Sequence, residues 1–489
     1  MGSGLIAGPS YGITAFGTYV PRLRIPRRAI AEAHAWMAPG LLAGARGARA
    51  FCNWDEDAVT MAVEAGRRAL AGGDGQAIDF VTLASTRMPY ADLQHATQVA
   101  AALRLREETQ TLDAGFSQRV GATVMRAALQ GARGDQLVIA SDRPAARPAS
   151  SQELAYGAGA AAFRLGTEGV LARLLGSATR SVPFVDHFRG ADQQYDYQWE
   201  ERWVRDEGAL KIIPATIEQA LRDAGMSLSD CKTLIVAAPE RGIGSAVAKR
   251  VGFRGDVIDT LPEDSGYAGA AQSLLLLAER LGRAAPGDCI LLVSFAHGCE
   301  ALVLQTTPEI AARNTSCVAS AQAPLETDSY LRFLTFEGGL QPEWGMRAEI
   351  VNKTALTEQY RSAPQMAGFV GGRCGRCGTT QFPVLPYCVN PACAAPSAQM
   401  EPVSLSDLRG RVVTHTADWL SAYKSPPLHV GFVQFGNGAR LQMEFTDVGP
   451  QGLPIGSEVE MVYRIKEQDP VRGYGRYFWK AAPAAAQET

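Results

Sequence analysis

Four cysteines arranged in two pairs are the clearest chemical feature of this sequence. Two residues separate Cys374 from Cys377, four separate Cys388 from Cys393, and each pair occupies a short turn that contains glycine or proline. Such turns let two thiolates converge, and two pairs complete a tetrahedral zinc site with no position open for substrate. The alternative is a redox Cys-x-x-Cys, which sits at a helix start and needs no second pair. We therefore expect a structural zinc ion.

The chain before these cysteines, from about Gly12 to Gln305, alternates amphipathic helical stretches with short apolar runs. This alternation is the pattern of an α/β fold, in which helices cover a largely parallel sheet. Strands are predicted at 80–84, 137–140, 160–164, 233–237, 290–293 and 301–304.

An internal repeat runs through the α/β region. The stretch GDQLVIAS at 134–141 recurs as GDCILLVS at 287–294, which is 153 positions later, and the same offset carries 83–85 onto 236–238. A chance recurrence of Gly-Asp before an apolar strand is the alternative, but two separated features in one register favour two homologous halves.

The composition changes after Gln305, where a stretch of small and polar residues (314–324) predicts a domain boundary. Beyond the cysteines, short strands predicted at 411–416, 429–434, 440–445 and 458–464 suit a small β-barrel. The expected division is a first half at 12–166, a second half at 167–308, a linker at 309–328, a helical lead at 329–370, the zinc ribbon at 371–400 and the barrel at 401–483.

The bulk composition excludes several classes of function. The 489 residues carry a formal charge of only −3, so the chain lacks the excess of positive charge that favours nucleic-acid binding. No apolar run is long enough to span a bilayer, and the first residues lack the features of a secretory signal. Five of the nine cysteines are scattered through apolar or helical sequence, as in a reducing compartment. We expect a cytoplasmic protein with no membrane or nucleic-acid partner.

The C-terminal region resembles a known type of domain. A cysteine ribbon after an aromatic lead, followed by GRVVTHT at 410–416, Pro426-Pro427 and a barrel, is similar to the rubredoxin-like zinc ribbon plus OB-fold domain that accompanies thiolases, aldolases and hydroxymethylglutaryl-CoA synthases. This resemblance, which covers Ser329 to about Pro483, implies a barrel that helps to hold acyl-CoA and bridges subunits.

The first 305 residues resemble hydroxymethylglutaryl-CoA synthase and its ketoacyl synthase III relatives. The matching stretches are WDEDAVTMAVEA at 54–65, YGAGAAA at 156–162 and AKRVGF at 248–253. The resemblance implies the five-layered thiolase fold, which consists of two similar halves, and the internal repeat agrees with that expectation.

The family's condensing residues are replaced in this chain. The resemblance places Gln118 where the family has its acyl-carrying cysteine and Thr86 where it has its glutamate. Ala237 stands in place of the histidine and Ser265 in place of the asparagine. An amide cannot form a thioester. Without the nucleophile, the base and the histidine that tunes the thiolate, ordinary Claisen condensation is not expected.

Several nearby residues are candidate substitutes. Ser117 is a hydroxyl next to Gln118, and His297 lies in the glycine loop that the resemblance places at the catalytic cavity. The alternative interpretation of His297 is a loop histidine that is hydrogen-bonded to the backbone. The free cysteines Cys52 and Cys299 are likewise interpreted as small buried apolar residues.

Glu240 and Arg241 follow the altered strand end. Together with Thr86 and Ser265 they are candidates for binding the substrate, although such charges are commonly just solvated or paired. The segment 186–213, dense in aromatic and charged residues, is a lid, a subunit contact or an ordinary amphipathic helix.

These observations predict an acyl-CoA-binding subunit that forms a homodimer or mixed oligomer and acts with a thiolase or aldolase partner. Carbon–carbon bond formation or cleavage is the expected chemistry. The alternatives are an active acyltransferase that uses relocated residues and a purely structural scaffold.

Overall fold

The computed structural model describes residues 11–71, 75–261, 265–312, 323–349 and 353–484. Its largest element is a ten-stranded sheet in the order β12-β11-β13-β14-β8-β1-β7-β6-β4-β5. The strands of the first half are β1 (Gly12–Tyr19), β4 (Ile78–Ala84), β5 (Gln110–Ala114), β6 (Asp135–Asp142) and β7 (Gly159–Gly166). Those of the second half are β8 (Ala172–Arg180), β11 (Thr233–Ala237), β12 (Asp256–Ile258), β13 (Cys289–Phe295) and β14 (Cys299–Thr306).

The two halves repeat one topology, as the sequence repeat predicts. β4 pairs in parallel with β5 and β6, and β11 pairs in parallel with β12 and β13. The halves meet where β1 and β8 pair antiparallel at Ile13 and Ala172. All six strands predicted in this region are present, five of them within a longer strand and 233–237 with the bounds of β11.

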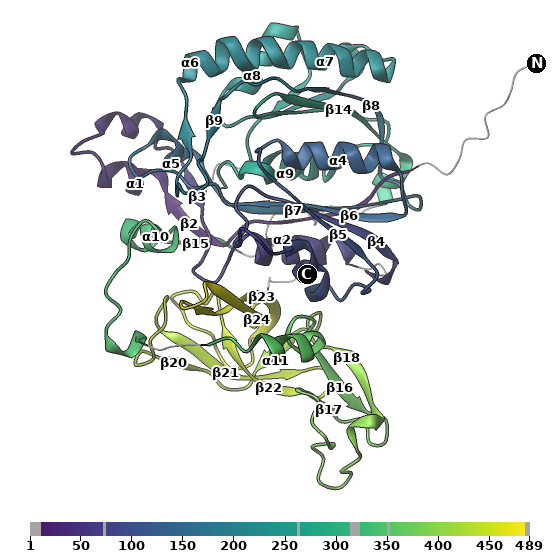
Figure 1. Cartoon of the computed structure of the whole chain (residues 1–489), viewed down its shortest axis with the longest axis vertical. Helices are drawn as coiled ribbons and strands as arrows, with labels where there is room; N and C mark the ends of the chain where they lie inside the picture. Colours follow the sequence, from purple (N-terminus) through teal and green to yellow (C-terminus); the bar gives the residue numbers. More distant parts are fainter. Residues whose placement is uncertain (1–10, 72–74, 262–264, 313–322, 350–352, 485–489) are drawn as a thin grey trace, which may run out of the picture.

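Helices complete five layers (Figure 1). α2 (Ala58–Leu70) and α3 (His95–Ala102) cover the outer face of the first half, and α7 (Leu210–Ala224) and α8 (Ile243–Val251) cover that of the second. α4 (Val120–Gly131) and α9 (Gln272–Leu281) pack against each other in the middle. The close approach of α4 to the turn just before α9 requires Gly121, because a Cβ there would lie 2.3 Å from the carbonyl oxygen of Ala270.

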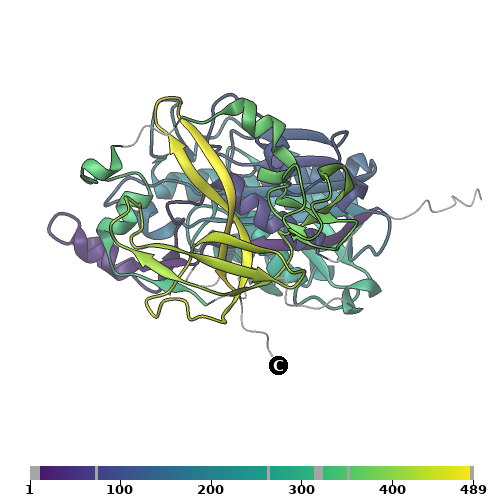
Figure 2. The same cartoon turned by 90° about the horizontal axis from the view of Figure 1, so that it is seen from below.

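The C-terminal region consists of a ribbon and a barrel, which lie over the body of the molecule (Figure 2). The ribbon is a three-stranded sheet of β16 (Val370–Cys374), β17 (Thr380–Gln381) and β18 (Met400–Ser404). The barrel strands are β19 (Gly410–Val412), β21 (Leu428–Phe435), β22 (Arg440–Phe445), β23 (Glu458–Asp469) and β24 (Tyr474–Pro483), with β20 (Thr416–Asp418) paired outside. Pairing of β19 with β21 closes the barrel.

The expected helical lead is broken into short pieces. The structure has α10 (Tyr330–Phe336), α11 (Leu356–Arg361) and α12 (Ala363–Met366), and two glycines follow the C-cap residue of α10. α10 packs Phe333 against Phe51 of the first half, with ring centroids 5.3 Å apart. Half of the predicted linker, 313–322, lies outside the described residues, but β15 (Leu325–Glu326) pairs with β2 (Leu23–Pro26).

The barrel packs directly on α2. The backbone N–H of Tyr463 donates to Oε1 of Glu64 at 2.8 Å, and the Tyr477 hydroxyl donates to Oδ2 of Asp57 at 2.6 Å. Apolar side chains of α2 and of the barrel belong to one buried cluster. The barrel is therefore fixed to the thiolase-like body by a continuous core.

Ion pairs between buried side chains also span the interface between the barrel and the first half. Arg464 of β23 lies 3.1 Å from Oε1 of Glu56 and 2.9 Å from Oδ2 of Asp447. Lys480 of β24 donates to Oδ2 of Asp55 at 2.9 Å. All of these side chains are buried, so each charge depends on its partners for stabilisation. Within the described residues, no helix has the length and apolar character needed to cross a membrane.

Candidate functional site

The four cysteines of the ribbon converge as the sequence predicts. Cys374 and Cys393 bring their sulfurs to 3.8 Å, Cys377 and Cys388 to 3.6 Å, and all four sulfurs lie within 4.8 Å of one another. A tetrahedron with zinc–sulfur bonds of about 2.3 Å has edges of about 3.8 Å. The donor set and its spacing therefore fit a zinc ion, and four thiolates would leave it no open position.

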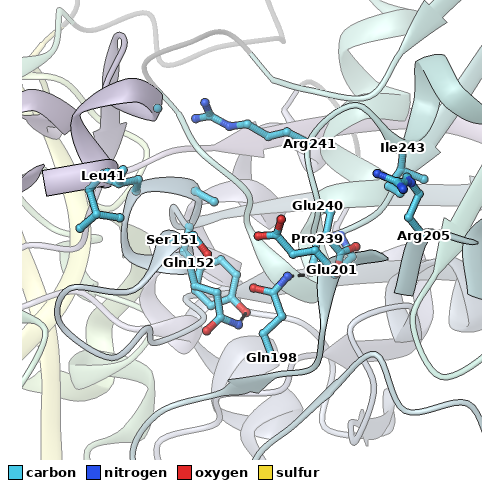
Figure 3. A pocket seen from close by; sticks show the side chains of 15 residues that line it. Leu41, Ser151, Gln152, Gln198, Glu201, Arg205, Pro239, Glu240, Arg241 and Ile243 are labelled. Carbon is cyan, nitrogen blue, oxygen red and sulfur yellow. Dashed lines mark hydrogen bonds between the residues drawn. The ribbon is translucent and has the colours of Figure 1, made fainter. Parts of the chain in front are cut away.

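A cavity of about 310 Å³ lies between the two halves, and Figure 3 shows its lining. Its walls come from η1 (Pro39–Gly44), α5 (Ser151–Ala155), β10 (Tyr197–Gln198) and the turn after β11. Ser151 and Gln152 lie on one side, and Gln198, Glu201 and Glu240 gather on the other. A second cavity of about 250 Å³ shares Ala155 and the stretch 239–241 with the first. Glu240 and Arg241, predicted to bind substrate, thus line both cavities.

Gln118 and Ser117 lie in the turn between β5 and α4 and line neither cavity. The Gln118 side chain is buried and donates from Nε2 to Oδ2 of Asp196 at 3.3 Å. The Ser117 hydroxyl donates to the carbonyl oxygen of Ala296 at 3.2 Å. No histidine or carboxylate among the described residues is hydrogen-bonded to that hydroxyl, so nothing in this arrangement activates it as a nucleophile.

Thr86 and Ser265 have structural partners. The Thr86 hydroxyl donates to Oδ2 of Asp142 at 2.7 Å, and the same oxygen accepts the N–H of Ala270 at 2.9 Å. Burial raises the pKa of Asp142, and the hydrogen-bond donors around this carboxylate partly offset that increase. The Ser265 carbonyl accepts the N–H of Ala50 at 3.1 Å. Their predicted role in substrate binding stays a prediction.

His297 has partners that the sequence analysis did not identify. Its backbone N–H donates to Oδ1 of Asp186 at 2.7 Å, and its Nε2 lies 2.5 Å from the carbonyl oxygen of His187. Nδ1 of His187 lies 2.5 Å from Oδ2 of Asp186. Burial alone would lower the pKa of His187, but the Asp186 carboxylate outweighs it and raises that pKa. The Asp186 carboxylate thus favours the protonated form of His187.

The Asp186, His187 and His297 cluster has the residue types of a metal site but an unsuitable geometry. The two imidazoles stack with centroids 4.9 Å apart and planes inclined by 19°. Ring-nitrogen lone pairs lie in the ring plane, so stacked rings do not aim them at a common point. The cluster is better described as a hydrogen-bonded carboxylate and imidazole pair with His297 stacked on it.

A hairpin of β9 (His187–Phe188) and β10 brings the unpredicted residues together. His187 pairs directly with Gln198, and Arg189 holds Asp196 through a 2.8 Å ion pair. Gln198 then donates from Nε2 to Oε1 of Glu240 at 3.0 Å. The segment 186–213 is thus neither a single helix nor wholly a surface element, because its first part packs into the site and its last part begins α7.

Comparison with known proteins identifies the relatives of this chain. No family model matches it. It is 32% identical over 303 residues to a hydroxymethylglutaryl-CoA synthase from Aeropyrum pernix, and the match covers 59% of this chain and 82% of that protein.

Solved structures share the fold. The 3-oxoacyl-(acyl carrier protein) synthase III from Pseudomonas aeruginosa superimposes with a TM-score of 0.53 at 21% identity, over 61% of this chain and 98% of the other. MvaS in complex with 3-hydroxy-3-methylglutaryl coenzyme A superimposes with a TM-score of 0.53 at 17% identity, over 63% and 86%. The predicted thiolase-like fold is confirmed.

Proposed function

Because the chain belongs to the hydroxymethylglutaryl-CoA synthase family, we propose that it binds acyl-CoA between its two halves yet forms no acyl-enzyme by itself. A thiolase or aldolase partner would complete the carbon–carbon bond chemistry. The observation that carries this proposal is the environment of Gln118. Its amide occupies the position where the resemblance places the cysteine, is buried, and is held by Asp196.

Two further features support the proposal. The cavities beside Glu240 and Arg241 give a CoA thioester a place to bind that does not depend on the lost residues. The four-cysteine cluster would hold zinc as a structural ion, which would fold the ribbon beside the barrel and take no part in the reaction.

Filling the cavity should abolish acyl-CoA binding. Gly44 lines it, and a Cβ added there meets only Leu154, at 3.9 Å, so Gly44→Trp places an indole in the cavity without a backbone clash. We expect titration calorimetry to show acetyl-CoA binding to the unmodified chain and at least about tenfold weaker binding to Gly44→Trp, a loss of about 1.4 kcal/mol.

The matched control is Gly436→Trp, on an open turn of the barrel where an added Cβ meets nothing within 4 Å. It should bind acetyl-CoA as the unmodified chain does. Binding that is undetectable in the unmodified chain, or equal in both variants, would contradict the proposed site.

We also propose that the chain forms a homodimer through the edge of its large sheet. β5 is the last strand of that sheet, so one of its edges pairs with no other strand among the described residues. Leu112 on this strand and Phe116 just after it are 56% and 102% exposed. Unprotected edges with exposed apolar residues favour pairing with another chain.

Light scattering should therefore give twice the chain mass, and the double variant Leu112→Lys, Phe116→Glu should give a monomer. Leu331→Lys is the control, because Leu331 is equally apolar and 64% exposed on α10, away from this edge. A stable monomer of the unmodified chain would show that the edge does not mediate dimerisation.

A further inference from the structure

Glu240 has an unusual environment on the wall of the cavity. It follows β11, the strand that ends in Ala237, and lines both cavities. One carboxylate oxygen accepts the Gln198 amide at 3.0 Å. The other, Oε2, is buried and has no hydrogen-bond partner from another described residue. A buried polar atom without a partner is rare and calls for an explanation, such as a bound ligand.

The lining of the cavities leads us to expect the acyl end of a thioester beside Glu240. Gln118 lines neither cavity, whereas Tyr156, Gln198 and Glu240 line the first. We therefore expect an acyl chain in the cavity to end at the wall that includes Tyr156 and Glu240. This is a different end point from the one that the family resemblance implies.

The charged groups around Glu240 suit reversible proton transfer. Burial raises its pKa to about 7, although the Gln198 hydrogen bond opposes the shift. A carboxyl group with a pKa near the working pH can take up and return a proton efficiently. The titratable groups that face it are Asp186 just before β9, His187 of β9, Glu201 and Arg205 at the cavity, Arg241, and the phenols of Tyr156 and Tyr267.

We propose that Glu240 is a general base that removes a proton from the carbon next to the thioester carbonyl of a bound acyl-CoA. The proposal rests on the acyl-CoA binding proposed above. The carbon–hydrogen bond breaks, its electron pair forms the carbon–carbon double bond of an enolate, and the carbonyl π pair moves to oxygen. The proton bonds to Glu240 and returns from there, so no oxidant, leaving group or acyl-enzyme is needed.

His187 is a positioning residue for this step. Its imidazole, whose protonated form Asp186 favours, lies close enough to Glu240 to lower the pKa of that carboxyl. Removing this imidazole should raise the pKa of Glu240 further, because a neighbouring cation favours the ionised carboxylate. His187→Gln should therefore shift the pH profile of proton transfer upward.

Hydrogen exchange at the acyl group tests the proposal directly. The full chain is incubated with acetyl-CoA in heavy water, and loss of the acetyl methyl signal is followed by proton NMR. We expect the exchange rate to rise with pH up to about 7 and then to become constant. Glu240→Gln should slow the exchange by about 100-fold or more. No free CoA should appear.

Glu218→Gln is the matched control, since Glu218 is an exposed carboxylate on α7 paired with Arg222, and it should exchange at the unmodified rate. Calorimetry on the same samples separates the two proposals. If the unmodified chain binds acetyl-CoA but catalyses no exchange, only the proposed role of Glu240 is overturned. The same holds if Glu240→Gln still binds acetyl-CoA and exchanges at the unmodified rate. Failure of the unmodified chain to bind acetyl-CoA would overturn the proposed function as well.

Discussion

Loss of one zinc ligand through Cys374→Ser is expected to unfold the ribbon and leave the ten-stranded sheet folded. The ribbon has only three short strands, and its own buried cluster consists of Cys374, Cys388 and Ala395. Structural zinc contributes about 10–16 kcal/mol of apparent binding free energy in small domains, which is folding free energy there. The purified chain should contain close to one zinc ion, and the variant's ribbon should become sensitive to limited proteolysis.

Cys231→Ala is the control, because Cys231 is buried in the second half, outside the cluster. It should retain zinc and an intact ribbon. Absence of stoichiometric zinc after gentle purification would contradict the assignment, as would a protease-resistant ribbon in Cys374→Ser.

Arg464→Ala is expected to destabilise the docking of the barrel strongly. The change leaves the Glu56 and Asp447 carboxylates buried without the cation that lies about 3 Å from each. Removing one partner of a buried ion pair costs about 3–5 kcal/mol, because the remaining charge loses its compensation. Urea unfolding followed by tryptophan fluorescence should show this loss, since Trp479 lies in the core shared by barrel and α2.

Arg472→Ala provides the comparison. Arg472 pairs with Asp469 at 2.7 Å but is 45% exposed, so its loss should cost less than about 1 kcal/mol. Combining Arg464→Ala with Asp447→Asn should recover part of the loss by removing one uncompensated charge. Equal small effects of both arginine substitutions would show that the charge cluster does not hold the barrel in place.

The sequence was most informative where apolar runs or paired cysteines determine the structure. β4, β6, β11 and β13 are rich in buried apolar residues, and their repeat could be recognised in register. β24 was not predicted. It alternates charged, aromatic and small residues, and Lys480 resembles a surface side chain until its buried partner Asp55 is known.

The candidate site was less predictable because its contacts join distant parts of the chain. The sequence analysis assigned His297 no carboxylate partner, but Asp186 lies 111 positions earlier and reaches it through a two-residue strand pair. Asp196 similarly meets Gln118 across 78 positions. Short strands rich in polar residues have weak patterns, so neither contact has a local signal in the sequence.

Intact-mass spectrometry of the isolated chain after incubation with acetyl-CoA and longer acyl-CoAs is the most direct test of the central claim. With Gln118 in the cysteine position, we expect an unchanged mass and no free CoA in a thiol assay, even where calorimetry shows binding. A mass increase of one acyl group would contradict this account. So would release of CoA by the chain alone that Ser117→Ala or His297→Ala abolishes.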